Sequence, residues 1–313
     1  MKNEVTKLNS ETGFIDKTLD YEGTGETITR TAVGHSISQY YGFRVAGRIN
    51  SAADYLRDNG DGTSTVIAAT PNYRVGTVVS NASASNLKTS IGDLLFLDLN
   101  GDGVIDDADK TFLGNGLPKY TFGWNNTVTW KQFGLSVFMY GSVGNKVFNW
   151  TRRRMDDPSL TPGGAAWNKY VRTAHYARWA YYDGNSGNND VWNVYVAPGS
   201  DPSIPRIDNL HNNYNSRVSD RYVEDASYLR IKNITLTYNA PKKLIKKYYL
   251  SDLRFSVNVQ NVCTFTGYTG YDPEVGSQNG QYSMTGVGML MYGVDTGRVP
   301  APRSVILGIE ATF

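Results

Sequence analysis

The sequence predicts an all-β fold of antiparallel strands, and three features of the chain support this prediction. The final segment, 303–313, alternates between apolar and polar residues as an extended strand does. The segment 119–144 contains two alternating runs joined by the short turn KQFG, which is the pattern of a β-hairpin. No run approaches the roughly 18 consecutive apolar residues of a membrane-spanning helix, so any segment that crosses a membrane must be a strand.

Composition and charge exclude several classes of function. The 313 residues suffice for one large or two ordinary domains, and the single Cys263 excludes an intrachain disulfide and a cysteine-based zinc site. The net charge of +2, without a long basic block, argues against nucleic acid as a partner. The segment 1–14 lacks the apolar core of a signal peptide, so we expect an exported protein to carry its signal upstream of Met1.

The first third of the chain is predicted to contain short strands separated by loops. Strand-like runs occur at 4–8, 26–33 and 36–47, without helical periodicity. Residues 51–90 are rich in Asn, Gly, Ser and Thr, and we predict a loop there that includes the turn sequence DNGDG at 58–62.

The hairpin at 119–144 gives the clearest assignment of side chains to faces. One face carries Tyr120, Phe122, Trp124, Val128 and Trp130, with Leu135, Val137 and Met139 in phase on the return strand. The other face of the first strand carries Thr121, Gly123, Asn125, Thr127 and Thr129. Two more strands are predicted at 227–241, where the apolar phase slips near Asn233, and at 253–261.

The C-terminal segment 303–313 shows the same alternation up to the last residue. Its apolar face comprises Val305, Leu307, Ile309, Ala311 and Phe313, and its other face is polar apart from Ile306. A strand of about 10 residues with one apolar and one polar face is typical of a transmembrane β-barrel. A strand of an ordinary β-sandwich has the same pattern, so this segment alone leaves both architectures open.

The connections between the predicted strands alternate between short and long. KQFG and the basic segment 241–251 are short, whereas 145–226 and 264–301 are long. Outer-membrane β-barrels have short periplasmic turns and long extracellular loops. If Phe313 lies on the periplasmic side, both short connections are periplasmic and both long ones are extracellular. A soluble sandwich has no reason to follow this order, so we favour an antiparallel transmembrane β-barrel segment.

Four blocks of sequence resemble the C-terminal part of the SusC/RagA-type TonB-dependent outer-membrane transporters. They are residues 28–49, 92–149, 219–245 continuing through 253–275, and 300–313, and they follow one another in the order found in that family. The resemblance implies that 1–313 is the C-terminal portion of a 22-stranded barrel whose lumen is closed by a plug domain. It also implies that this chain contains about seven or eight of the strands, without the plug or the TonB box, and we expect it to be a fragment.

The resemblance further implies a function and a set of partners. Transporters of this family import oligosaccharides or peptides through the outer membrane of Gram-negative bacteria, with a SusD-like surface lipoprotein as a lid. TonB acts on them through the N-terminal region, which is missing here, and lipid surrounds the barrel. The long loops are then extracellular and the C-terminus is periplasmic, where the strand ending in Phe313 is recognised during barrel assembly.

The segment DLNGDGVIDDAD, 98–109, matches the spacing of a calcium-binding loop. The candidate ligands are Asp98, Asn100, Asp102, the carbonyl of Val104, Asp106 and Asp109, with Gly103 at the turn. Two features depart from an EF-hand, because the last ligand is Asp rather than Glu and the flanks LLFL and KTFLG are strand-like. The sequence therefore predicts a structural Ca²⁺ site, and the alternative is an Asx/Gly-rich turn without an ion.

The long segment 145–226 carries a cluster of Trp and Tyr residues. Such rings could stack on sugars or contact the lid protein, but we favour a structural role in holding the long loop together. The run Arg152–Arg154 could bind an anion, and we favour a solvated charge cluster. The lysines of 242–247 are predicted to form a solvated periplasmic turn.

No catalytic motif is present, so we predict that the protein is not an enzyme. The chain contains no G-x-S-x-G, no P-loop, no H-E-x-x-H and no G-x-G-x-x-G. The alternative function is a secreted, calcium-stabilised β-sandwich that serves as a binding or adhesin-like module. It would account for the Asp-rich loop and the aromatic residues but not for the order of short and long connections. A third and weaker possibility is a pseudogene product without function.

Overall fold

The computed structural model describes residues 3–19, 25–159, 169–210, 212–276 and 288–313. These residues divide into two compact units, each assembled from three stretches of the chain. The first unit comprises Met1–Asn115, Phe148–Val223 and Ser277–Thr296, and the second comprises Gly116–Val147, Glu224–Gly276 and Gly297–Phe313. The sequence predicts a single portion of a barrel over 1–313 and does not predict two units.

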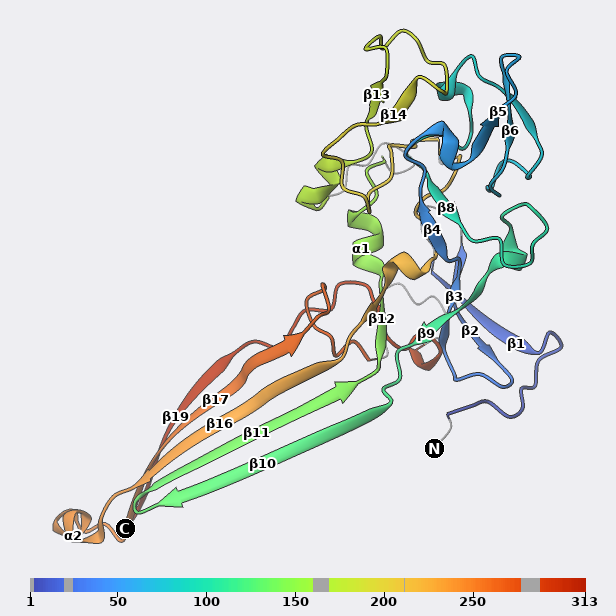
Figure 1. Cartoon of the computed structure of the whole chain (residues 1–313). Helices are drawn as coiled ribbons and strands as arrows, with labels where there is room; N and C mark the ends of the chain where they lie inside the picture. The colour runs from blue at the N-terminus through green and yellow to red at the C-terminus, as the bar shows by residue number, and fades with distance from the viewer. Residues whose placement is uncertain (1–2, 20–24, 160–168, 211, 277–287) are drawn as a thin grey trace. The chain divides into compact units, whose positions relative to one another are not determined.

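The second unit is built on one antiparallel sheet of five long strands (Figure 1). In order across the sheet, the strands are β10 (Tyr120–Trp130), β11 (Phe133–Val143), β16 (Tyr228–Asn239), β17 (Asp252–Thr266) and β19 (Ser304–Thr312). The short helix α2 (Lys242–Ile245) and a 3-10 turn, η6 (Lys246–Tyr248), connect β16 to β17. The predicted hairpin, both later strands and the terminal strand are therefore confirmed.

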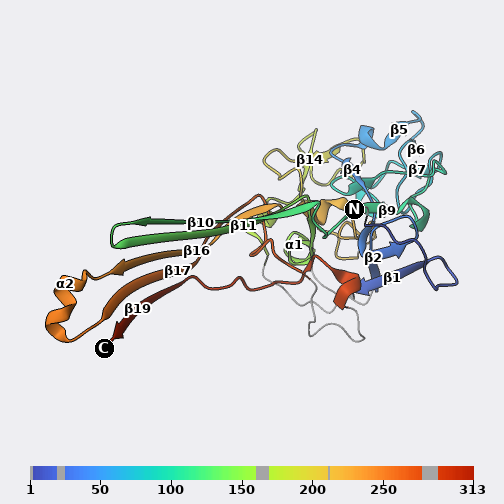
Figure 2. The ribbon, with the colours of Figure 1, turned by 90° about the horizontal axis from the view of Figure 1, so that it is seen from below.

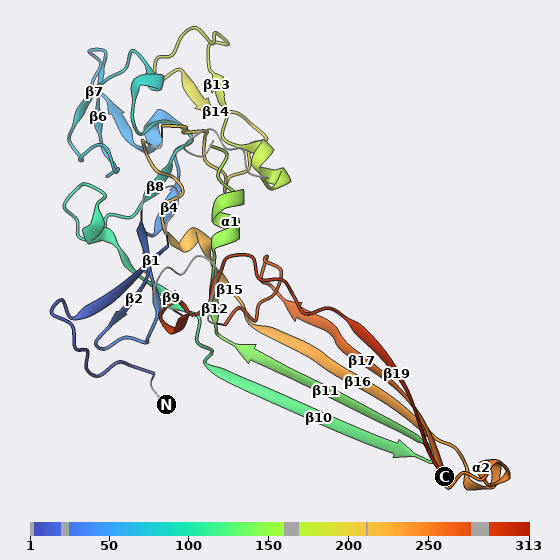
Figure 3. The same cartoon turned by 180° about the vertical axis from the view of Figure 1, so that it is seen from behind.

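Both short connections lie at one end of this sheet, as the order of connections predicts. The turn between β10 and β11 and the α2–η6 connection are at the same end as Phe313, and Figure 3 shows this end with α2 beside the C-terminus. Lys131 adopts the left-handed conformation, with φ +54°, that closes the first turn in two residues. The long connections leave from the opposite end of the strands.

The first unit consists of several small sheets. One sheet contains β1 (Phe14–Leu19), β2 (Glu26–Ala32), β3 (Gln39–Gly42) and β9 (Thr111–Asn115). A second contains β5 (Leu56–Asp58), β6 (Thr63–Val66) and β7 (Val78–Ser80). There are also two pairs of strands, β4 (Val45–Arg48) with β8 (Leu94–Phe96) and β13 (Trp179–Tyr181) with β14 (Val194–Val196). β12 (Lys146–Asn149) pairs in parallel with β18 (Val294–Asp295) and leads into helix α1 (Trp150–Met155), and β15 (Val223–Asp225) precedes β16. Among the described residues, no helix is long and apolar enough to cross a membrane.

The aromatic residues of 145–226 pack into cores that they share with the N-terminal part of the chain. Trp150 is buried with Ile28 and Tyr40 in one cluster. Trp179 and Trp192 pack against a second cluster that includes Tyr55. The structural role is thus confirmed for Trp150, Trp179 and Trp192, although the core is not internal to the long segment and Tyr182 is 67% exposed. Trp167 lies outside the described residues.

Two predictions for the N-terminal part are wrong. Residues 51–90 are not a loop, because β5, β6 and β7 form a sheet there. These strands have only three or four residues each, which is too short for alternation to be detected. The run 4–8 forms only an isolated bridge from Val5 to Val33, and the strand in this region is β1 instead.

The number of barrel-like strands also differs from the prediction. The described residues contain five long strands in one sheet rather than about seven or eight. The strand-like runs at 26–33 and 36–47 belong instead to the first unit, where β2 pairs with β1 and β3, and β3 pairs with β9. Their own pattern does not reveal this, because a strand's partner is set by contacts distant in sequence.

Candidate functional site

The hydrogen-bond register places the apolar residues of all five strands on one face of the second unit's sheet. Directly paired residues of antiparallel strands point to the same side. One cross-strand row comprises Val128, Leu135, Leu236, Val257 and Leu307, and the next comprises Asn126, Val137, Ile234, Val259 and Val305. We call this side the apolar face. It contains the residues that sequence alternation predicts, with Asn126 as a polar exception.

Much of the apolar face is exposed. Leu307 is 76% exposed, Ile309 is 73% exposed and Trp130 is 65% exposed. Monomeric soluble proteins rarely expose a contiguous apolar patch larger than a few hundred Å². A continuous apolar sheet surface of this kind is typical of strands that contact lipid.

A β-bulge in β16 keeps the apolar residues on one face. Against β11, Phe138 pairs with Asn233 and Met139 pairs with Ile231, so Lys232 is the extra residue of β16. Against β17 the extra residue is in β17, where Gln260 pairs with Asn233 and Cys263 pairs with Ile231. Its Nζ donates to Oδ1 of Asn261 at 2.7 Å. The slip of apolar phase near Asn233 is therefore confirmed, and its cause is this bulge.

The opposite, polar face of the sheet carries a buried arginine, Arg230 of β16. Its guanidinium donates to the carboxylate of Asp272 at 2.5 Å and to that of Glu274 at 3.0 Å. The hydroxyl of Tyr140 donates to the same Glu274 carboxylate at 2.7 Å. These contacts fasten the segment that follows β17 to the polar face. This network was not predicted from the sequence. The one signal available there is a charged residue, Arg230, within a predicted strand.

The loop 98–109 uses its predicted calcium ligands as hydrogen-bond acceptors for its own backbone. Both carboxylate oxygens of Asp98 accept backbone N–H groups, from Gly101 at 2.6 Å and Gly103 at 2.7 Å. The side chains of Asn100, Asp102 and Asp106 each accept from the backbone two residues further on.

Asp109, the last predicted ligand, is fully buried and turns inward. It accepts from the backbone N–H of Leu99 and of Asp106, both at 2.8 Å. The backbone N–H of Val104 donates to Oδ1 of Asp102 at 3.0 Å. In the described part of the chain, no three His, Cys, Asp or Glu side chains form a group that could hold a metal ion. The hydrogen bonding is thus that of the Asx/Gly-rich turn.

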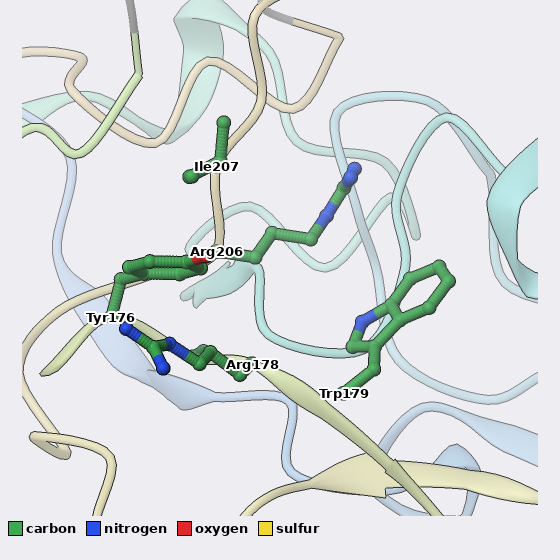
Figure 4. A pocket seen from close by; sticks show the side chains of 6 residues that line it. Tyr176, Arg178, Trp179, Arg206 and Ile207 are labelled. Carbon is green, nitrogen blue, oxygen red and sulfur yellow. The ribbon is translucent and has the colours of Figure 1, made fainter. Parts of the chain in front are cut away.

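A cavity of about 370 Å³ lies in the first unit between the start of β13 and the segment 205–207 (Figure 4). Its walls are Tyr176, Ala177, Arg178, Trp179, Arg206 and Ile207. The guanidinium of Arg178 lies 5.0 Å from the centre of the Tyr176 ring. Arg206 instead reaches the buried carboxylate of Asp93 through two hydrogen bonds, at 2.8 and 3.0 Å.

A glycine lies in close contact with two residues that line this cavity, Arg206 and Ala177. Gly92 has φ +94°, and a Cβ there would lie 2.8 Å from Cβ of Arg206 and 3.1 Å from Cβ of Ala177. The backbone N–H of Arg206 donates to the carbonyl of Gly92 at 2.8 Å. The close approach and the left-handed conformation together require glycine. The cavity is a product of long-range packing, and no motif marks it in the sequence.

The prediction of a solvated charge cluster at Arg152–Arg154 is wrong. Arg153 is fully buried and forms an ion pair with Glu26, which is 127 positions distant. Arg152 pairs at 2.9 Å with Asp156, which is also fully buried. Arg153 joins α1 to the rest of the first unit, whereas the pair of Arg152 with Asp156 lies within α1 and its C-cap. The partner of Arg153 could not be identified from local sequence.

Comparison with known proteins finds related receptors, although no model of a protein family matches the chain. The chain is 30% identical over 243 residues to TonB-dependent receptor P3 of Formosa agariphila. The matched region covers 77% of this chain and 21% of the receptor. TonB-dependent receptor P26 of the same organism is 26% identical over 314 residues, covering 100% of this chain and 26% of the receptor. TonB-dependent receptor SusC of Bacteroides thetaiotaomicron is 26% identical over 220 residues, covering 70% and 17%.

The fold is also similar to that of a solved transporter. The structure of the RagAB peptide transporter superposes with a TM-score of 0.57 at 18% identity, covering 99% of this chain and 26% of that chain. At this level of identity the likeness concerns the fold alone. The chain spans about a quarter or less of the length of these relatives.

Proposed function

We propose that this chain, which belongs to the SusC/RagA type of TonB-dependent transporters, forms part of the wall of an outer-membrane barrel that imports nutrients. The observation that carries the proposal is the apolar face, which continues across five strands and is widely exposed. In this proposal the apolar face contacts lipid and the polar face lines the lumen. The protein contributes binding and gating, and no enzymatic step.

The partners follow from the family. We propose that the transporter works with a SusD-like surface lipoprotein and is driven by TonB. The substrate class is a peptide or an oligosaccharide, and the name of the RagAB peptide transporter supports the first of these. The end of the sheet with the short turns and Phe313 is proposed to be periplasmic. The long connections are then extracellular, where they could meet the substrate and the lipoprotein.

Quenching of tryptophan fluorescence by brominated lipid tests the membrane role. Trp124 and Trp130 lie on the apolar face and are 48% and 65% exposed. We expect bromine near the acyl-chain ends to quench Trp124 and bromine near the headgroup to quench Trp130, because they lie at different depths along β10. Replacing both by phenylalanine should remove the part of the tryptophan fluorescence that brominated lipid quenches. The control variant Trp192→Phe changes a half-buried residue of the first unit and should keep this quenchable fluorescence.

A secreted sandwich gives a different result in this experiment. Its apolar face would be covered by protein, so brominated lipid would leave Trp124 and Trp130 unquenched. The protein would also stay in the soluble fraction without detergent.

We also propose that the loop 98–109 binds Ca²⁺ as a structural ion, on the strength of its ligand spacing. Hard cations require six to eight oxygen ligands, so binding requires Asp98 and Asp102 to exchange backbone partners for the ion. The proposed role is to stiffen a loop that millimolar extracellular calcium would reach.

Calcium titration of the full chain tests this site. We expect calcium to raise the thermal midpoint of the parent and not that of the variant with Asp98→Ala and Asp102→Ala. The matched control is Asp61→Ala with Asp183→Ala, which removes two exposed aspartates of other turns. An equal calcium shift in the parent and the Asp98/Asp102 variant would eliminate the metal site.

A further inference from the structure

The connection between β16 and β17 concentrates exposed positive charge and exposed apolar side chains. We call residues 241–251 the basic turn. Lys242, Lys243, Lys246 and Lys247 are all exposed, as are Leu244 (64%), Tyr248 (69%) and Tyr249 (90%). The turn contains no Asp or Glu. None of the ion pairs in the described part of the chain includes one of these lysines.

The basic turn is held in a defined place at the end of the sheet (Figure 2). Ile245 is buried at the end of α2 and anchors the turn. The backbone N–H of Leu250 donates to the carbonyl of Ile245 at 3.3 Å, and that of Ser251 donates to the carbonyl of Thr312 at 2.7 Å. Tyr249 closes the turn in the left-handed conformation, with φ +60°. The lysines are therefore presented by a fixed scaffold, beside the last residues of β19.

A row of aromatic residues crosses the apolar face next to the basic turn. The register aligns Trp130, Phe133, Tyr238 and Phe255 across four strands. The rings of Phe133 and Tyr238 are 4.9 Å apart, and Nζ of Lys131 lies 4.8 Å from the Trp130 ring. Aromatic rings gather at the level of the headgroups in membrane barrels. Lysines just beyond such a row have the reach to meet phosphate groups.

We propose that the basic turn binds the headgroups of anionic phospholipids in the leaflet at this end of the barrel. This proposal rests on the proposed membrane function. The four lysines supply charge complementary to lipid phosphate, and Leu244, Tyr248 and Tyr249 supply apolar contacts to the same interface. A soluble acidic protein would explain the lysines but not the apolar residues or the adjoining aromatic row. The turn thus fixes the depth of the sheet in the bilayer.

Lipid retention in nanodiscs tests this proposal on the transporter that carries the chain. Nanodiscs of phosphatidylethanolamine are compared with nanodiscs that also contain phosphatidylglycerol, and the phosphatidylglycerol kept after detergent extraction is counted by native mass spectrometry. We expect the variant Lys246→Gln with Lys247→Gln to bind phosphatidylglycerol about 25-fold more weakly, because each lysine near an anionic surface contributes about fivefold. The loss should shrink at high salt.

Two matched variants make the result specific. Lys7→Gln with Lys88→Gln removes the same charge from exposed lysines of the first unit and should retain phosphatidylglycerol. Lys246→Arg with Lys247→Arg keeps the charge and should also retain it. Equal retention by the parent and the Lys246/Lys247 glutamine variant overturns the lipid proposal, and so does equal loss in the Lys7/Lys88 control. A parent that enters neither type of nanodisc overturns the proposed membrane function instead.

Discussion

Replacing Arg206 by leucine is expected to lower the free energy of unfolding of the first unit by about 3–5 kcal/mol at neutral pH. Arg206 forms two hydrogen bonds, at 2.8 and 3.0 Å, with Asp93, whose side chain is fully buried. Removing one partner of a buried ion pair leaves the other charge without compensation. Asn215 still donates to Asp93 at 2.8 Å, but an amide does not neutralise a carboxylate. Urea unfolding and hydrogen exchange of β8 would measure the loss.

The pH dependence of this variant identifies the cause of the loss. Burial raises the pKa of the Asp93 carboxyl above its ordinary value of 3.8, and Arg206 opposes that shift. Without Arg206 the folded-state pKa rises further, so the folded state binds a proton that the unfolded state releases. A raised pKa stabilises the folded state at low pH and loses that stabilisation as the pH rises. The deficit of Arg206→Leu should therefore shrink as the pH falls toward about 4.

Two further variants separate the ion pair from the packing of the cavity. Arg178→Leu removes an exposed arginine from the same cavity (Figure 4) and is expected to lower the free energy of unfolding by no more than about 1 kcal/mol. Adding Asp93→Asn to Arg206→Leu removes the stranded charge and should restore part of the stability. A deficit that is independent of pH, or equal to that of Arg178→Leu, would show that the charge is not the cause.

The long strands could be predicted from the sequence because their structure is recorded in local alternation. β10 and β11 are consecutive and separated by a two-residue turn, so their pairing follows from proximity. The bulge at Lys232 appears in the sequence as a slip of phase, because a single inserted residue exchanges the two faces of β16. The apolar face of the sheet was therefore assigned correctly before its neighbours were known.

The first unit could not be predicted in the same way, because its contacts join positions far apart. The partner of Arg153 is Glu26, and the cavity around Arg206 depends on the glycine at position 92. Strands of three or four residues carry too little alternation to be recognised. In the loop 98–109 the local pattern is clear, but it is compatible with two different structures. Its spacing predicts ligands, yet the same Asp side chains satisfy nearby backbone N–H groups, so the pattern alone does not distinguish the two uses.

The substitution Val259→Arg is expected to lower the free energy of unfolding by about 2–4 kcal/mol in lipid, because an arginine on the lipid face of a barrel is most unfavourable near the middle of the bilayer. Val259 lies in a central row of the apolar face, between Ile234 and Val305. The control Gln260→Arg changes the next residue, which is on the polar face. It should have little effect, because that side is proposed to face the lumen. Urea unfolding in liposomes compares the two variants directly.

A series along β17 makes the membrane explanation specific. Val259, Val257 and Phe255 share the apolar face and approach the basic turn in that order. The penalty of arginine should fall along this series to about 0–1 kcal/mol at Phe255, because a long side chain near the interface can place its charge among the headgroups. A covered face of a soluble sandwich has no such gradient of depth. Equal penalties at Val259 and Phe255, or an equal penalty at Gln260, would contradict the assignment of this face to lipid.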